Sequence, residues 1–336
     1  MTINIAKVLA EHKCHASLEI LDLLLGGGEI TRPQFDALLT GLVPLHEEHN
    51  REVAELVRLV CEPPVPKPLH DWDFRYLGPG TLPVGWRCYG TRTDAVVQRL
   101  FVTVSNEEWG QNGGRTGWYR GLVDLRWTDD GLVMPWEPDP RGGLRCGYLT
   151  TDYGGPVIPA LCRVEFDGYW THGIKGLWAA LGWLCASDGG AGRAEVDVSE
   201  YLPAHSLTGV SHVLHGRVAG ETRYNFGTRY LGRRSNSYVL PAGMDLAEPH
   251  THWFEARPEG GTVRLSWGID EHTMESFTHN ELLKAGVDWT LPQGWTIDSC
   301  TESEGNGGGK LDPTYKGGAS MTLQAVRVWD LTGEGK

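Results

Sequence analysis

The sequence predicts an all-β domain, a sandwich or a barrel, that follows a short α-helical segment. From residue 69 onward the apolar runs are short and are separated by Gly, Asp and Asn, as expected for strands joined by turns. Glycine accounts for 45 of the 336 residues, against a usual share of roughly 7%, and tryptophan for 14. Apolar residues at helical spacing are confined to the N-terminal part of the chain. These observations together favour one large β domain.

Residues 1–61 are expected to form a helical hairpin. Residues 4–25 have an amphipathic pattern that ends at three consecutive glycines, a common C-terminal signal. A second helix is expected from Thr31, because Thr31 and Gln34 have the spacing of a capping box. The hairpin can pack on itself or on the following domain, or it can serve oligomerisation or docking. The pattern leaves these alternatives open.

Residues 62–68 read "EPPVPKP" and are expected to form a stiff linker, because four of the seven are proline. The β domain then spans residues 69–336. Its strands are expected within runs such as "RLFVTVS", "ALCRVEFDGYW", "AEVDVSEYL", "GTVRLSWGID" and "MTLQAVRVWDL". No repeat of 20 to 50 residues is visible, so a repeat architecture is not expected.

Charge and hydropathy exclude several functional classes. The net charge is −13 and no basic face is evident, which argues against a nucleic-acid partner. No run of 18 apolar residues exists, so we expect no membrane insertion. The N-terminal apolar residues are interrupted by charged ones, unlike a signal peptide. We therefore expect a soluble protein without a signal peptide, either cytoplasmic or associated with a virion.

The cysteines do not indicate a disulfide framework or a zinc site. Their number is odd, their spacings are wide and no CxxC pair occurs, so we expect buried reduced thiols. No other spacing indicates a metal site. The seven positions are Cys14, Cys61, Cys88, Cys146, Cys162, Cys185 and Cys300.

The run "RAEVDVSEYL", residues 193–202, carries three acids on a predicted strand. Side chains alternate between the two faces of a strand, so Glu195 and Asp197 share a face. Glu200 is five positions from Glu195, and regular alternation sends it to the opposite face. A β-bulge between Asp197 and Glu200 would return it to the first face. The run alone leaves both alternatives open.

Several segments, in order, resemble glycoside hydrolase family 16, the laminarinase and lichenase group. "GLWAALGWLCASDGGAGRAEVDVSEY" is similar to the family's "LWPAFWLL" run followed by E-x-D-x-x-E. "PHTHWFEARPEGGTVRLSWGID" and "MTLQAVRVWD" resemble later strands of the family. The resemblance covers roughly residues 70–330 and departs from the family at Asp167, where Arg is usual. It implies a concanavalin-like β-jelly-roll sandwich.

The resemblance implies a bulged strand whose three acids face one groove. By position, Glu195 matches the nucleophile and Glu200 the general acid/base, with Asp197 between them orienting Glu195. Crowded carboxyl groups cannot all ionise at neutral pH, so we expect at least one to keep its proton. His215 matches a histidine beside the catalytic strand and is expected to bond a carboxylate or the sugar. No cofactor is required; some family members carry a structural calcium ion, which this sequence does not indicate.

Aromatic platforms are expected in the groove, because indole rings stack on the apolar faces of sugars. Trp178 and Trp183 precede the acid strand and are five positions apart, so a regular strand would present only one of them to the groove. Trp178 matches the family better. Trp170, Trp253 and Trp267 are further candidates that serve the core equally well. Arg163 and Glu165 are expected as neighbours of the groove.

These observations predict a retaining endo-β-glycosidase that hydrolyses a β-linked glucan or galactan. One alternative is a carbohydrate-binding protein of the same fold without turnover. The other is a structural component such as a phage tail or virion protein. In that alternative, residues 1–60 form a homo-oligomer or contact virion partners.

Overall fold

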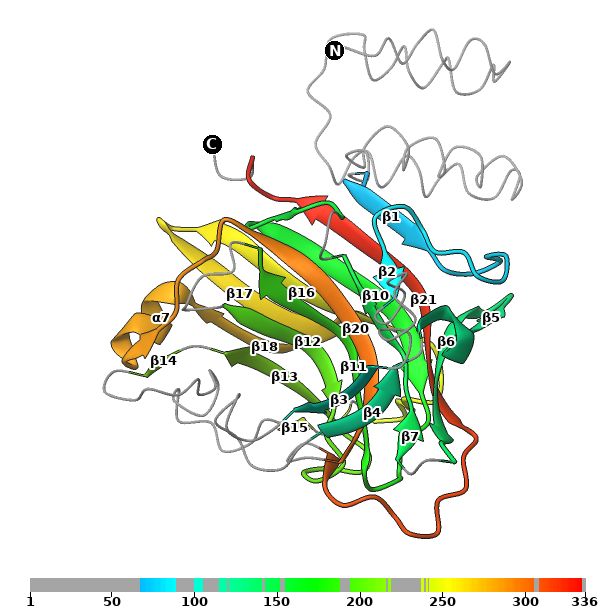
Figure 1. The fold of residues 1–336 in the computed structure, drawn as a ribbon. Coiled ribbons are helices and arrows are strands. Elements are labelled where there is room, and N and C mark those ends of the chain that lie inside the picture. Colours follow the sequence, from blue (N-terminus) through cyan, green and yellow to red (C-terminus); the bar gives the residue numbers. More distant parts are fainter. Residues whose placement is uncertain are drawn as a thin grey trace, which may run out of the picture. The chain divides into compact units, whose positions relative to one another are not determined.

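The structure is a computed structural model of the 336-residue chain (Figure 1). It describes residues 67–88, 100–104, 115–119, 121–140, 143–151, 155–187, 194–215, 217–218, 237–238, 240, 242–304 and 308–333. The chain divides into two units, residues 1–66 and residues 67–336. The first unit lies outside the described residues, as does most of the linker. The helical hairpin over residues 1–61, the linker over 62–68 and the docking role of residues 1–60 therefore stay predictions.

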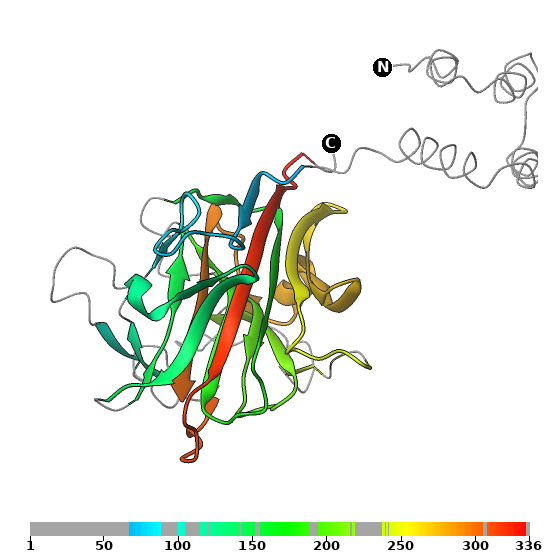
Figure 2. The same ribbon diagram turned by 90° about the vertical axis from the view of Figure 1, so that its right-hand side faces the viewer.

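The second unit is a sandwich of two sheets, as predicted. We call the first the β10 sheet. Its central strands run in the order β18, β17, β16, β10, β21, and all pairs are antiparallel. β1 and β6 both lie along the other edge of β21, and β5 pairs with β6 (Figures 1 and 2). The strands are β1 (His70–Asp73), β5 (Arg126–Thr128), β6 (Gly131–Pro138), β10 (Cys162–Trp170), β16 (His250–Glu259), β17 (Thr262–Ile269), β18 (His272–Thr278) and β21 (Ala319–Asp330).

The second sheet, the β12 sheet, has the central order β15, β13, β12, β11, β20, again antiparallel. β4, β8 and β9 follow one another along the far edge of β20. β6 pairs with β7 as well as with β21, which links the two sheets. The strands are β2 (Arg87–Cys88), β3 (Leu100–Val104), β4 (Arg115–Tyr119), β7 (Leu144–Arg145), β8 (Tyr148–Thr150), β9 (Ile158–Pro159), β11 (Leu177–Ala186), β12 (Glu195–Tyr201), β13 (Val210–His215), β15 (Ser237–Tyr238) and β20 (Gly294–Glu304).

Four smaller elements complete the secondary structure of the described residues. A 3-10 turn, η2, covers Gly121–Asp124, and β14 (Arg217–Val218) pairs with β19 (Val287–Asp288). The six-residue helix α7 (His279–Lys284) begins after Thr278, whose hydroxyl accepts from the backbone N–H of Glu281. The Glu281 carboxylate accepts in return from the Thr278 backbone N–H, which completes a capping box.

The core lies between the sheets and follows the alternation of each strand. On β10, Cys162, Val164 and Phe166 point inward, while the residues between them are partly exposed. Opposite Phe166, a Cβ atom on Gly182 of β11 would lie 2.2 Å from the Phe166 ring. Only glycine allows the strand to pass so close, and this contact bears on the site described below.

The cysteines and hydropathy of the described residues add two findings. Cys88, Cys146, Cys162, Cys185 and Cys300 are all free thiols. Burial raises the pKa of Cys88 to about 12, so this thiol is unreactive at neutral pH. No helix in the described part of the chain is long and apolar enough to cross a membrane.

Candidate active site

The acid strand β12 contains the β-bulge. In its pairing with β13, Glu195 lies opposite His215 and Asp197 opposite Val213, but Glu200 lies opposite Ser211. Three positions on β12 therefore match two positions on β13. The extra residue shifts the alternation by one, so Glu200 returns to the face of Asp197. Of the two alternatives that the sequence left open, the bulge is correct.

Burial on β12 independently assigns the faces. Val196, Val198 and Tyr201 are fully buried in the core between the sheets. The three acids alternate with them and therefore lie on the outward face of the β12 sheet, which we call the cleft face. The Glu195 side chain is 18% exposed and that of Asp197 only 3% exposed.

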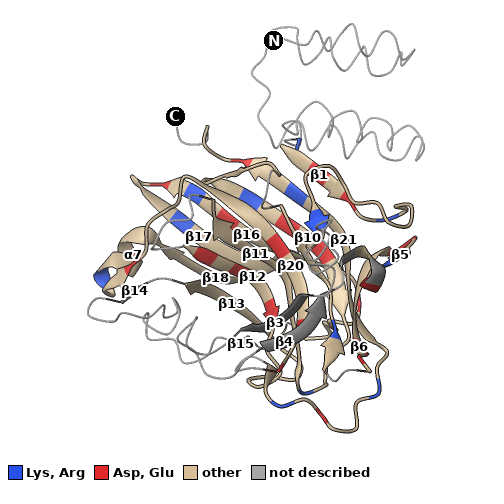
Figure 3. Ribbon diagram, viewed as in Figure 1, with Lys and Arg blue, Asp and Glu red and all other residues tan. Residues whose placement is uncertain are grey.

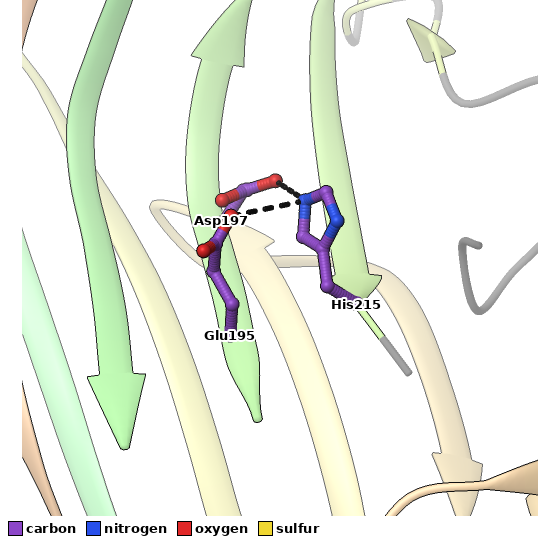
Figure 4. Close-up of side chains that lie close together, drawn as sticks. All are labelled: Glu195, Asp197 and His215. Carbon is purple, nitrogen blue, oxygen red and sulfur yellow. Dashed lines mark hydrogen bonds and ion pairs between the residues drawn. The ribbon is translucent and has the colours of Figure 1, made fainter. Parts of the chain in front are cut away.

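His215 joins two of the acids. Its Nε2 lies 2.6 Å from Asp197 Oδ2 and 3.4 Å from Glu195 Oε1 (Figure 4). A carboxylate can only accept, so when Asp197 is ionised the proton of this short bond sits on His215 Nε2. The predicted contact between His215 and a carboxylate is thus present. It forms because β12 and β13 pair Glu195 directly with His215.

Interior side chains fix the backbone of β12 from behind. The Trp267 indole N–H donates to the Asp197 carbonyl at 3.1 Å, and His212 Nδ1 lies 2.6 Å from the Val198 carbonyl. Both side chains are buried, and burial lowers the pKa of His212 to about 4. A neutral His212 with its proton on Nδ1 donates to that carbonyl. Trp267 therefore belongs to the core and not to the groove.

The two tryptophans of β11 share the cleft face, contrary to the prediction that only one would reach it. In its pairing with β20, β11 has its own register shift between Ala180 and Trp183, at the glycine that passes Phe166. The shift adds one position, so residues five apart return to the same face. The rings of Trp178 and Trp183 lie 5.8 Å apart. Trp178 is only 1% exposed, whereas Trp183 is partly exposed, so Trp183 is the more accessible platform.

Three residues of the cleft face were missed by the sequence interpretation. Asp298 and Glu302 lie on β20 and are buried, and Tyr148 lies on β8. Trp183 pairs with Asp298 on one side and with Asp197 on the other, and its indole N–H donates to Asp298 Oδ2 at 2.8 Å. The alternation of Asp298, Cys300 and Glu302 along "IDSCTE" is the signal that could have revealed this face.

The structure corrects four other predicted groove residues. Trp170 is 1% exposed and lies in the core, beside Tyr201 and His252. Trp253 alternates with core residues on β16 and so faces outward from the β10 sheet, under the Arg163 guanidinium. Arg163 and Glu165 lie on that same outward face, where they pair with each other at 2.8 Å. The sequence could not reveal which sheet each strand joins.

Glu195, Asp197 and His215 could also hold a metal ion. One donor atom from each residue lies within 4.8 Å of the other two. Carboxylate oxygen and imidazole nitrogen are ordinary ligands for divalent metals. Sequence spacing indicated no such site, because the third ligand comes from the neighbouring strand. Its donor atom, His215 Nε2, already bonds Asp197.

The cleft face is acidic. The strands β8, β11, β12, β13 and β20 contain no Lys or Arg. Their cleft-facing acids are Glu195, Asp197, Glu200, Asp298 and Glu302. Arg87 of β2, which pairs with Thr150 of β8, is the Arg on the neighbouring strand.

Comparison with solved structures identifies the fold. The chain is similar to the catalytic domain of an endo-1,3-β-glucanase (laminarinase) from Thermotoga petrophila, with 18% identity, a TM-score of 0.58, and coverage of 79% of this chain and 98% of that one. The chain is also similar to the laminarinase from Rhodothermus marinus, with 17% identity, a TM-score of 0.56, and coverage of 78% of this chain and 96% of that one. A third similar structure is a glycosyl hydrolase family 16 protein from Mycobacterium smegmatis, with 17% identity, a TM-score of 0.52, and coverage of 78% of this chain and 100% of that one.

Sequence comparisons found no matching family model and no matching curated protein. At identities of 17–18% the likeness to the solved structures is one of fold. The resemblance seen in the sequence is confirmed at that level: the described β domain has the fold of the family 16 laminarinases.

Proposed function

We propose that the protein is a retaining endo-β-glycosidase that hydrolyses a β-linked polysaccharide. The observation that carries this proposal is the bulge in β12, which turns Glu195, Asp197 and Glu200 to one face and sets His215 beside the first two. Retaining glycosidases need two carboxyl groups ~5–5.5 Å apart on either side of the bond that is cut. Glu195 and Glu200 are the pair proposed for these roles.

The reaction is a double displacement. The Glu195 carboxylate attacks the anomeric carbon while the glycosidic C–O bond breaks, and the carboxylic acid of Glu200 gives its proton to the departing oxygen. A glycosyl ester on Glu195 results. Glu200, now a carboxylate, takes a proton from water, and the water oxygen attacks the anomeric carbon. This second step releases Glu195 and returns the proton to Glu200. No cofactor takes part.

Asp197 and His215 support the nucleophile. Asp197 is almost fully buried and accepts a short hydrogen bond from His215, so its orientation is fixed. The same imidazole nitrogen lies 3.4 Å from Glu195, where it can stabilise the carboxylate between turnovers. These contacts support a role for the pair in orienting Glu195 and in balancing the crowded negative charge.

A β-1,3-glucan is the substrate best supported. The solved structures that share this fold include enzymes described as laminarinases and endo-1,3-β-glucanases. Trp183, with Trp178 behind it, offers a ring on the cleft face for the apolar side of a sugar. No finding supports virion association, and that idea concerns residues 1–60, outside the described residues.

A reducing-sugar assay tests the proposal. Laminarin, mixed-linkage glucan, agarose and carrageenan are each incubated with the wild type, Glu195→Gln, Glu200→Gln and the control Glu271→Gln. Glu271 is a suitable control because its side chain is 82% exposed. We expect turnover of laminarin that both active-site changes abolish and the control preserves. Binding without turnover, unchanged in both variants, would instead indicate a carbohydrate-binding protein.

A further inference from the structure

We propose that Asp298 is a positioning residue that holds the Trp183 indole as a platform for an uncharged sugar unit. This inference rests on the proposed function and adds the substrate class. Asp298 lies on β20, two strands from the acid strand, and in the same cross-strand row as Trp183 and Asp197. The row runs across the cleft face, so a sugar on Trp183 adjoins the reacting unit.

Asp298 fixes the ring through a direct bond. Its Oδ2 accepts the Trp183 indole N–H at 2.8 Å, and Asp298 is only 6% exposed. A charged acceptor makes such a bond stronger than a neutral one. Tyr148 meets the indole edge-on at 5.8 Å, and Trp178 lies at the same distance at a tilt. The ring is therefore held by one polar contact and two aromatic contacts.

The Asp298 carboxylate also makes the electrostatic environment of the Trp183 ring negative. Burial raises the pKa of Tyr148, and the charge of Asp298 raises it further. Burial likewise raises the pKa of Cys185, with Asp298 among the further causes. In its cross-strand row, Trp183 lies between Asp197 and Asp298, and Arg87 of the same row lies two strands beyond Asp298. A sulfate or carboxylate on a sugar over Trp183 would meet repulsion at short range, where screening by water is weak.

The test compares Asp298→Leu, which removes the acceptor, with Asp298→Asn, which keeps an acceptor but removes the charge. On neutral laminarin we expect Asp298→Leu to raise KM about tenfold with kcat little changed, because a buried indole N–H loses its partner. Asp298→Asn should restore KM to near the wild-type value. Asp71→Leu and Asp71→Asn are matched controls, because Asp71 is exposed on β1 of the other sheet.

A double-mutant cycle tests whether Asp298 acts through the ring. Trp183→Phe keeps an aromatic platform but lacks the N–H. If the bond carries the effect, adding Asp298→Leu to Trp183→Phe should raise KM by less than about twofold, well short of the single change. The proposal would be overturned if the two changes raised KM additively. It would also be overturned if Asp298→Asn raised KM as much as Asp298→Leu does.

Substrate charge is tested with carboxymethylated laminarin. We expect the kcat/KM of the wild type to be at least about tenfold lower on carboxymethylated laminarin than on laminarin. In Asp298→Asn this difference between the two substrates should be several-fold smaller. A ratio that Asp298→Asn leaves unchanged would contradict the assigned substrate class. Binding of laminarin oligosaccharides to each variant is measured in parallel. If the wild type binds them without turnover, the proposed enzyme fails while Asp298 is still tested by affinity; if it neither binds nor cuts, both proposals fail.

Discussion

The outward faces of the two sheets both carry acids, but they neutralise them differently. On the β10 sheet, Arg327 donates to Glu165 and to Asp167 at 2.6–3.2 Å, and Arg163 lies between Glu165 and Glu255. Figure 3 shows Lys or Arg beside Asp or Glu across this sheet. On the cleft face of the β12 sheet, five acids lie on strands without a single Lys or Arg.

This difference separates acids that form a network with arginines from acids that gather on the strands of the candidate site. Burial lowers the pKa of Arg327, but Asp167 and Glu165 outweigh it and hold that pKa above its usual value, as expected for a mutually satisfied network. Several largely buried acids crowded on one face are characteristic of a functional site. The predictions that follow test this contrast, from the largest expected effect to the smallest.

The largest effect is expected at Glu200. Glu200→Gln should lower kcat on laminarin by on the order of 10³-fold or more, because the departing oxygen no longer receives a proton. A substrate with a good leaving group, such as a dinitrophenyl β-glycoside, needs no such proton and should lose far less. Equal losses on the two substrates would remove Glu200 from the acid role.

The interior between the two faces should be sensitive to acid. Burial lowers the pKa of His212 to about 4 and that of His252 well below its usual value. When folding lowers the pKa of a base, the protein keeps its full free energy of unfolding above the unfolded pKa of about 6.5. It loses part of that free energy as the pH falls toward the folded pKa. For His212 the loss amounts to about 3 kcal/mol between pH 6.5 and 4.

Urea unfolding at pH 7 and pH 4.5 measures this loss. His252 is the better residue to replace, because both its ring nitrogens lack a hydrogen-bond partner within the described structure. His252→Phe should flatten the dependence of stability on pH. An unchanged slope would show that His252 carries no part of the acid sensitivity.

His215 should affect rate more than stability. His215→Asn should lower kcat about 10- to 100-fold and alter the acidic limb of the kcat/KM profile, because Asp197 and Glu195 lose a shared partner. The measurement is a pH–rate profile with a thermal unfolding control. A uniform loss at all pH values, with a lower melting temperature, would instead assign His215 to the fold.

The smallest effects are expected on the β10 sheet, and there on stability alone. Arg327→Met should destabilise the protein by about 2 kcal/mol, because Asp167 keeps a partly buried charge with only the Thr251 hydroxyl as partner and Glu165 keeps only Arg163. Arg264→Met, which breaks a more exposed pair with Glu259, should change the free energy of unfolding far less, because water screens an exposed ion pair. Neither change should alter kcat. If Arg327→Met lowered activity without lowering stability, the claim that charged residues on the β10 sheet serve only the fold would be wrong.

The sequence predicted the strands well but not their placement. Alternation within β12 correctly placed Glu195 and Asp197 on one face, and the family resemblance supplied the bulge that returns Glu200 to it. Alternation does not say which face is inward or which sheet a strand joins, so Trp253 was expected in the groove and lies on the opposite sheet. A bulge reverses the alternation beyond it, and the one at Gly182 depends on a contact with Phe166 from the other sheet.

Asp298 was missed for a related reason. Its importance comes from a bond to Trp183, more than a hundred positions away along the chain, and a local pattern contains no sign of that partner. Asp167 is similar: it departs from the family pattern, and only the pairing of β10 with β21 shows that Arg327 satisfies it. Cross-strand partners across distant segments are therefore the part of the site that needs the structure.

The most direct test of the account is the stereochemistry of the first product. Proton NMR during early hydrolysis of laminarin resolves the two anomers of the new reducing end. Attack by Glu195 followed by attack of water inverts the anomeric carbon twice, so the β anomer should appear first and the α anomer later, by mutarotation. Initial release of the α anomer would mean a single displacement, and the assignment of Glu195 as nucleophile would be wrong.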